Sequence, residues 1–211
     1  MNSAGRRYLF ALLGSTTLYW LSALVNSLPF QMNRLVDLST SLDAAITFSP
    51  HGVWLYAMYY PLLLYPLLGR QSVEDAAHLS RAMLIFSCFS FLVFLAFPVE
   101  CPRPADNLLG ESLSGHFLRM IYFLDRPNNC FPSLHVLHSW IISIHFARKQ
   151  NETYYIRLGL LLAATGVTVS TMMIRQHFFL DVAASILLLA FASAATRFAM
   201  ALRLRTQNAN K

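Results

Sequence analysis

The chain is poor in charged residues. Asp, Glu, Lys and Arg make up only 12% of its 211 residues, whereas a soluble domain usually contains about 25%. Hydrophobic residues account for 56% of the chain, and the mean hydropathy is +0.48. This shortage of charge excludes an ordinary soluble domain and indicates a protein that lies in a membrane.

Linker sequences and several kinds of binding cluster are also missing. We find no Gly/Ser-rich stretch, low-complexity tract or internal repeat, so we expect a single polytopic membrane domain over residues 1–211. No group of carboxylates suits Mg²⁺, which argues against a metal-dependent site. The basic residues are dispersed and have no aromatic platform beside them, which argues against nucleic-acid binding despite the pI of 9.5.

Six apolar runs fill most of the sequence. Several approach or exceed the roughly 20 residues that span a bilayer as a helix, and runs of this length in lipid are helical. We therefore predict an all-α integral membrane protein with six transmembrane helices and a short surface helix in the 98–131 segment. The fourth run is the shortest, and we expect it to be buried among the others. The runs are 8–28, 49–68, 76–97, 132–146, 154–174 and 177–200.

The basic residues indicate how these runs are oriented. If the runs alternate in direction, one face carries both termini and the turns near 69–78 and 147–154. That face receives 11 of the 16 Lys and Arg residues, and cytoplasmic loops are the ones rich in Lys and Arg. We therefore expect both termini in the cytoplasm. Segments 29–48, 98–131 and 174–177 would then lie on the periplasmic, extracellular or lumenal face.

Three polar stretches return to that outer face, although they lie far apart in the sequence. They are FPVECPRP at the end of the third run, CFPSLHVLHS at the start of the fourth, and STMMIRQHFFLD between the fifth and sixth. Charged side chains near membrane depth are costly and are rarely without a function. Their convergence therefore indicates a functional site on this face.

The residues of these stretches suit phosphoryl transfer. His177 and Asp181 are four positions apart, a spacing at which the aspartate orients the imidazole and stabilises its cation. His135 supplies a second imidazole for proton transfer near neutral pH. Arg103 and Arg175 offer permanent positive donors to phosphate oxygens. Each motif is common on its own, and their joint presence on one face is what indicates a site.

The order of PRP, PSLH and S-x6-H-x3-D resembles the signatures of the type-2 phosphatidic acid phosphatase superfamily, over about residues 97–182. The resemblance implies that His177 is a nucleophile that forms a phosphohistidine, with Asp181 as its orienting partner. It implies that His135 protonates the leaving oxygen, and that Arg103 and Ser133 bind phosphate. A site of this kind would use neither a metal nor another cofactor.

The sequence departs from the family signatures at three positions. Ala96 replaces the lysine of the first signature, Leu134 the glycine of the second, and Thr171 the arginine of the third. Ser170 of the third signature is present, and we infer that Arg175 supplies the missing charge and binds phosphate with it. The PSLH form is closer to the branch with inositol phosphorylceramide synthases and bacterial relatives, which includes transferases.

Other polar residues of the outer half have weaker indications. Arg126 belongs to a second RP pair and is a further candidate ligand for phosphate. His116 and Arg119 lie in an apolar stretch that predicts the short surface helix. His138 follows His135 by about one turn and either lines the site or packs beside it, whereas His145 is expected to be structural.

These features predict a membrane-embedded phosphatase that hydrolyses a phosphomonoester or diphosphate lipid through a phosphohistidine. A lipid phosphotransferase, which moves the phosphoryl or phospho-headgroup to an acceptor alcohol, remains open because it would use the same residues. A proton-coupled transporter is a different class, and the gathering of polar groups at one face argues against it. The expected partners are the lipid substrate and membrane lipids, and a homo-oligomer remains open.

The three cysteines carry a separate prediction. Cys88 lies inside the third run, where we expect a small apolar core residue. Cys101 and Cys130 flank the long outer segment, one beside PRP and the other beside PSLH. We predict a disulfide between them, because the outer compartment is oxidising. This bond would hold Arg103 against the fourth helix.

Overall fold

The computed structural model describes residues 1–68 and 71–209, and the chain is mostly helical. The predicted all-α class is therefore confirmed. Arg70 and Lys211, two of the basic residues assigned to the cytoplasmic face, lie outside the described residues, as do the side chains of Arg197, Arg203 and Arg205.

Three helices are long and apolar enough to cross a membrane. They are α1 (Ser3–Asn26), α6 (Val73–Ala96) and α9 (Tyr154–Met173). A polar side chain caps the first turn of each helix: Asn2 accepts from Gly5 N, and Ser72 and Thr153 play the same part in α6 and α9. These helices fit a membrane location, and a total of six crossings stays a prediction.

The second apolar run is not one continuous helix. It is divided into η1 (Pro50–Gly52), α4 (Val53–Tyr56), α5 (Tyr59–Leu64) and η2 (Tyr65–Leu68). A proline has no N–H, and its ring clashes with the carbonyl four residues earlier. Pro61 therefore accounts for the end of α4 near Ala57, and Pro66 for the change to a 3-10 helix after α5.

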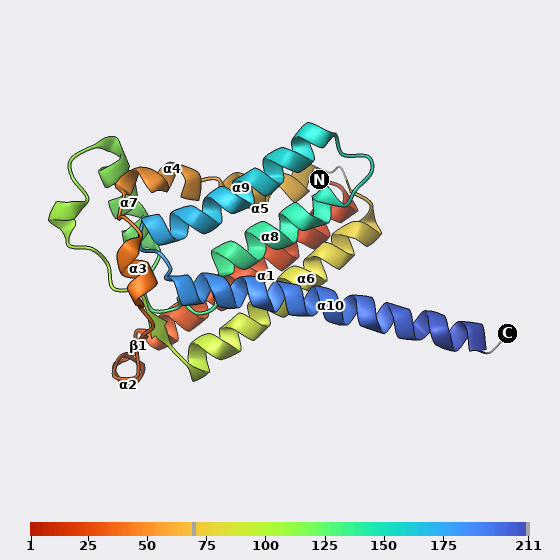
Figure 1. Cartoon of the computed structure of the whole chain (residues 1–211), viewed down its shortest axis with the longest axis horizontal. Helices are drawn as coiled ribbons and strands as arrows, with labels where there is room; N and C mark the ends of the chain where they lie inside the picture. Colours follow the sequence, from red (N-terminus) through yellow and green to blue (C-terminus); the bar gives the residue numbers. More distant parts are fainter. Residues whose placement is uncertain (69–70, 210–211) are drawn as a thin grey trace.

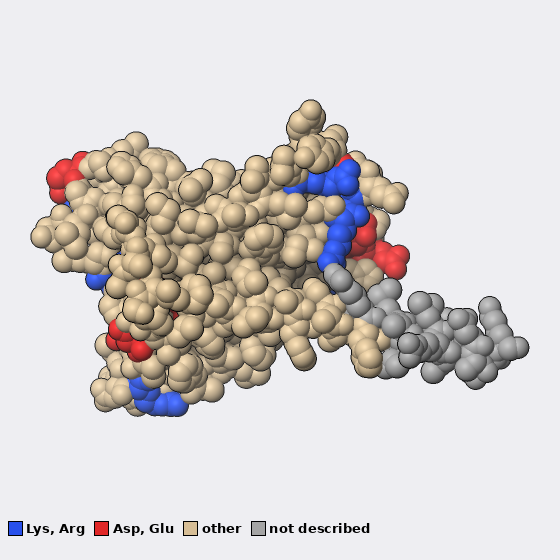
Figure 2. Space-filling view, viewed as in Figure 1, with Lys and Arg blue, Asp and Glu red and all other residues tan. Residues whose placement is uncertain are grey.

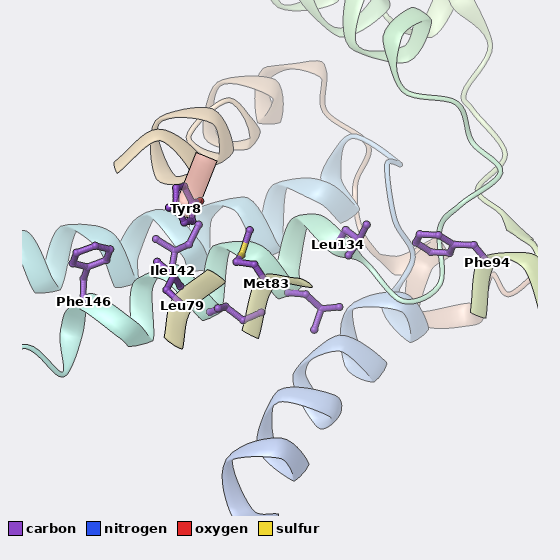
Figure 3. Close-up of a cluster of buried hydrophobic side chains, with 9 residues drawn as sticks. Tyr8, Leu79, Met83, Phe94, Leu134, Ile142 and Phe146 are labelled. Atoms are coloured by element: carbon purple, nitrogen blue, oxygen red, sulfur yellow. The ribbon is translucent and has the colours of Figure 1, made fainter. Parts of the chain in front are cut away.

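The remaining apolar runs form α8 (Leu134–Ala147) and α10 (Phe179–Ala209). The expectation that α8 is buried is confirmed, since nine of its residues are buried. Its side chains form the centre of a hydrophobic cluster with α1 and α6 (Figure 3). This packing fixes the axis of α8 and hence the position of His135 in its first turn. The cluster comprises Tyr8, Leu79, Met83, Phe94, Leu134, Leu137, Ile141, Ile142 and Phe146.

The long connections gather at one end of the bundle (Figure 1). They contain α2 (Pro29–Met32), α3 (Ser41–Ala45), η3 (Asp106–Leu108) and α7 (Leu113–Leu124). The predicted short helix in the 98–131 segment is therefore present as α7. Two short strands, β1 (Val36–Asp37) and β2 (Val99–Glu100), pair in parallel with Val36 opposite Val99. This pairing joins the connection after α1 to the connection after α6.

Charged side chains lie toward the two ends of the bundle, and the broad band between them is nearly free of charge on the face that Figure 2 shows. The N-terminus and the turn between α8 and α9 lie at the end opposite the long connections (Figure 1). This arrangement agrees with the predicted grouping of the loops. Which end faces the cytoplasm stays a prediction.

Candidate active site

His135 stands at the start of α8, where Ser133 caps the helix. Ser133 Oγ accepts from Val136 N at 3.3 Å, and the Ser133 carbonyl accepts from Leu137 N at 3.0 Å. The Ser133 side chain is fully buried, so its hydroxyl serves the helix end. The cap places His135 one residue inside the helix, where it lines the cavity described below.

His177 lies just before α10 and faces His135 from the other side of the site. Its Nε2 is 3.1 Å from His135 Nδ1, and its Nδ1 is 3.5 Å from Asp181 Oδ2. Asp181 is fully buried in the first turn of α10, and its Oδ2 also accepts from Phe178 N at 2.8 Å. The structure therefore brings together the three residues that the sequence predicted as catalytic.

Arg103 is held beside the two histidines by backbone carbonyls. Its Nη1 donates to Arg175 O at 2.7 Å and its Nη2 to Asp125 O at 3.2 Å. The guanidinium also lies 4.4 Å from the centre of the Tyr122 ring. Its Nε is buried without a hydrogen-bond partner in the described part of the chain. A fixed positive group with an unused donor suits a phosphate oxygen.

A cavity of about 300 Å³ connects these groups to the apolar faces of three helices. His135, His177 and Arg103 lie on its wall. The rest of the wall is mainly apolar and aromatic, and comes from α1, α5 and α7. Its members include Leu12, Trp20, Tyr60, Leu63, Ile121 and Leu124. The cavity therefore suits a molecule with an anionic head and an apolar body.

Comparison with known proteins agrees with this geometry. The model of a family described as the PAP2 superfamily matches residues 19–195, which is most of the chain. The chain belongs to the PAP2 superfamily. Members of this superfamily are phosphatases or phosphotransferases that act on phosphate esters. The chain matches no curated protein and no solved structure.

The other arginine of the predicted pair lies elsewhere in this PAP2 chain. Arg175 Nη1 donates to Asp43 O at 2.7 Å and Nη2 to Ile46 O at 2.8 Å, and the side chain is not part of the cavity wall. The chain turns here after α9, with Arg175 at a φ of 51°, a value uncommon outside glycine. Its carbonyl, and not its guanidinium, reaches Arg103. The structure therefore does not place the Arg175 guanidinium on the histidines.

Two further candidates for phosphate binding differ in position. Ser170 is buried within α9, where its Oγ donates to Val167 O at 2.9 Å, and it does not line the cavity. Arg126 is exposed and lines the cavity, with Nη1 donating to Ser27 Oγ at 2.9 Å. Of the arginines predicted to bind phosphate, Arg103 and Arg126 therefore line the cavity.

One acidic residue of the site was missed from the sequence. Asp125 Oδ2 lies 3.7 Å from His135 Nε2, and the carboxylate accepts hydrogen bonds from Tyr19 Oη and Gln176 Nε2. Tyr56 Oη lies 2.7 Å from the same His135 nitrogen. Asp125 belongs to none of the signatures. The only sequence signal was its place before the second RP pair of the outer segment.

The Asp125 carboxyl is a weaker acid than an ordinary aspartate, because its pKa is raised. Burial raises its pKa to about 6, although the nearby His177 and the hydrogen bond from Gln176 act in the opposite direction. Its side chain is 17% exposed. Asp125 therefore changes charge close to neutral pH, beside the histidine that is the predicted acid.

The predicted disulfide is wrong, because all three cysteines are free thiols, and all three lie in the described part of the chain. Cys101 and Cys130 are close to each other, as expected, and both are buried, but each S–H has its own acceptor. Cys101 Sγ donates to Asp181 Oδ2 at 3.3 Å, and Cys130 Sγ donates to the Pro127 carbonyl at 3.5 Å. Burial raises the pKa of the Cys101 thiol well above its usual range, which keeps this donor protonated.

The remaining histidines and Cys88 complete the comparison with the sequence predictions. His138 lines the cavity, and its ring nitrogens contact Ser87 Oγ at 3.0 Å and Tyr59 Oη at 3.2 Å. Both predicted roles, lining and packing, therefore apply to it. Cys88, expected in the core, is exposed on α6 instead. His116 and Arg119 lie on α7, as predicted, and Arg119 pairs with Asp106 at 2.8 Å.

Proposed function

We propose that the protein is a membrane-embedded lipid phosphate phosphatase that works through a phosphohistidine on His177. The observation that carries the proposal is the 3.1 Å contact between His177 Nε2 and His135 Nδ1, with Asp181 at the other His177 nitrogen. The negative charge of Asp181, which lies 3.5 Å from Nδ1 without a hydrogen bond to it, favours a proton on that nitrogen and leaves the lone pair on Nε2. The reactive nitrogen is then the one on the cavity side.

The reaction has two steps. In the first step His177 Nε2 attacks phosphorus, the bond from phosphorus to the leaving oxygen breaks, and His135 gives that oxygen a proton. In the second step water attacks the phosphohistidine while His135 takes a proton from it, and the phosphorus–nitrogen bond breaks to release phosphate. The 3.1 Å contact between the imidazoles supports this division of roles, because a donor and a nucleophile this close would act on the same phosphorus atom.

Arg103 supports the charge that develops on the phosphoryl oxygens. Two backbone carbonyls fix its guanidinium before a substrate binds, so little reorganisation is needed during the reaction. Arg126 stands on the same wall and is suited to a second anionic group. A diphosphate lipid would use both arginines, whereas a phosphomonoester would need Arg103 alone.

The apolar part of the cavity supports a lipid substrate. Its wall joins the phosphate end to residues of α1 and α5, such as Trp20 and Leu63. An acyl or isoprenoid chain that occupied this part would keep its tail among apolar groups while its headgroup reached the histidines. The substrate class proposed is therefore a phosphomonoester or diphosphate of a long-chain alcohol or diacylglycerol.

A lipid phosphotransferase is the second candidate, and one feature favours it. A second pocket of about 420 Å³ shares Arg103 with the first, and Ser39, Thr40 and Arg175 are among the residues that line it. A polar acceptor alcohol in this pocket would approach the same phosphohistidine in place of water. Both reactions share the first step and differ only in the second nucleophile.

Phosphate release from a panel of lipid phosphates, with and without acceptor alcohols, tests the proposal. Purified protein in detergent should release inorganic phosphate from at least one lipid and should form an acid-labile phosphoenzyme that His177→Ala lacks. Turnover should continue in EDTA. Phosphoenzyme that persists in His177→Ala would reject the nucleophile, and transfer to an alcohol without phosphate release would select the transferase.

A further inference from the structure

A compact group of metal-ligating atoms lies around His177 and Asp181. Cys101 Sγ, Cys130 Sγ and a ring nitrogen of His177 all lie within 4.8 Å of one another. Asp181 Oδ2 lies 3.3 Å from Cys101 Sγ and 3.5 Å from His177 Nδ1. None of these four side chains is more than 4% exposed.

Two buried atoms of this group lack a hydrogen bond. Within the described part of the chain, His177 Nδ1 and Asp181 Oδ1 have no hydrogen-bond partner. Buried polar atoms in native structures nearly always have a partner, and an exception needs a physical reason. A nitrogen left unused beside a carboxylate and two sulfur atoms indicates a place for a cation.

We propose that Cys101, Cys130, His177 and Asp181 form an inhibitory Zn²⁺ site. Thiolate and imidazole are the ligands that favour Zn²⁺ over Mg²⁺ or Ca²⁺. Zinc–sulfur bonds of about 2.3 Å and zinc–nitrogen bonds of about 2.0 Å put tetrahedral ligand atoms roughly 3.3 to 3.8 Å apart. The separations from Asp181 Oδ2 to Cys101 Sγ (3.3 Å) and to His177 Nδ1 (3.5 Å) lie in this range, and the two sulfur atoms and the imidazole nitrogen lie within 4.8 Å of one another.

Binding exchanges protons for the metal. The two thiols lose their protons to solvent as two zinc–sulfur bonds form, and the lone pair of His177 Nδ1 forms the third bond. Cys101 Sγ then no longer donates to Asp181 Oδ2, and this oxygen, which keeps its hydrogen bond from Phe178 N, is the fourth ligand. Cys130 and His177 line the cavity, so the ion reaches the site through the opening that serves the substrate.

The metal would block the reaction through the tautomer of His177. A neutral imidazole that coordinates a metal through Nδ1 carries its proton on Nε2. Nε2 then has no lone pair for phosphorus, although His135 and Arg103 remain in place. This consequence rests on the proposed function, whereas the binding of the metal does not.

Metal binding is measured first, without reference to activity. Cd²⁺ replaces Zn²⁺ as a probe, because cadmium–thiolate bonds absorb in the ultraviolet. The full chain in detergent should develop this absorption with one Cd²⁺ per chain. Cys101→Ser and Cys130→Ser should each bind at least about tenfold more weakly. Cys88→Ser is the matched control, because this exposed thiol lies outside the site, and it should bind like the natural chain.

Inhibition is measured second, as the ratio of turnover with and without Zn²⁺ within each variant. This ratio should fall steeply in the natural chain and in Cys88→Ser, be restored by EDTA, and stay near one in Cys130→Ser. Absence of cadmium–thiolate absorption, or equal absorption after both Cys101 and Cys130 are replaced, overturns the site. If the absorption appears but no phosphate ester is cleaved, the site stands and the proposed function fails. If turnover is found and Zn²⁺ inhibits every variant equally, the inhibitory role is rejected.

Discussion

The two ring nitrogens of His177 face different surroundings. Nε2 lies 3.1 Å from His135 Nδ1, at the polar end of an open cavity. Nδ1 lies 3.5 Å from Asp181, on a side where the thiols of Cys101 and Cys130 are buried. One nitrogen is therefore accessible to a substrate, and the other lies near side chains that are almost completely buried. The difference indicates that the open side performs the reaction and the closed side sets the state of the imidazole.

Removal of either imidazole on the open side should have the largest effect. We expect His177→Ala and His135→Ala to lower phosphate release by about 10⁴-fold or more, as with the removal of residues that act as a unit. The effects should not add in the double variant, because each loss already prevents the first step. Release of inorganic phosphate by the purified proteins measures this. Additive losses would show that the two histidines act independently.

A change on the closed side should cost less but remain severe. Asp181→Asn keeps the shape of the side chain and removes the charge at His177 Nδ1, so we expect a loss of about 10³- to 10⁴-fold in turnover. Asp106→Asn is the matched control, because that carboxylate is exposed and forms its ion pair with Arg119 of α7. Neither residue lines the cavity. Near-normal turnover of Asp181→Asn would mean that the closed side does not orient the nucleophile.

The sequence predicted the centre of the site because helix alternation alone determines where its residues converge. Long apolar runs begin or end beside His135, His177 and Arg103, so counting the runs places these residues at the same end of the helix bundle. Asp125 could not be placed in this way. It lies directly after α7, where its carboxylate accepts a hydrogen bond from Tyr19 of α1. No local sequence pattern reveals a contact between residues so far apart in the chain.

Two differences between the structure and the sequence predictions have a similar origin in backbone detail. The second run was expected to be one helix, but Pro61 and Pro66 divide it into short helices. The Arg175 guanidinium was expected beside the histidines. The left-handed backbone at this residue instead directs the side chain to the carbonyls of Asp43 and Ile46, to which it donates hydrogen bonds. Hydrophobic runs therefore predict which end of the bundle a residue occupies. They do not predict the direction of its side chain in a turn.

Arg103 and Arg175 allow a comparison between an arginine on the wall of this cavity and one outside it. Arg103→Ala removes the fixed cation from the cavity wall, and we expect turnover to fall by about 10²- to 10³-fold. Arg175→Ala removes two hydrogen bonds to carbonyls outside this cavity, so we expect mainly a lower thermal midpoint and a much smaller loss of turnover. Turnover and thermal unfolding of both variants are measured together. An equal loss of turnover at constant stability would place Arg175 in direct contact with phosphate.

The smallest effect concerns the charge of Asp125 beside His135. Its pKa of about 6 in the folded chain lies above the value of about 3.9 in an unfolded one. The neutral carboxyl therefore favours the folded state, and this advantage is present below about pH 4 and is lost as the pH rises through 6. Asp125→Asn should accordingly gain stability relative to the natural chain at pH 8 and not at pH 4.

The charge of Asp125 should affect activity in the opposite direction from stability, since the ionised carboxylate should favour turnover. Above pH 6 the ionised Asp125 lies 3.7 Å from His135 Nε2 and favours the imidazolium that protonates the leaving oxygen. Asp125→Asn should therefore lose the rise in turnover between pH 5 and 7 and be several-fold slower than the natural chain at pH 7. The same rise in both pH–rate profiles would assign it to another group and reduce Asp125 to a hydrogen-bond partner of Tyr19 and Gln176.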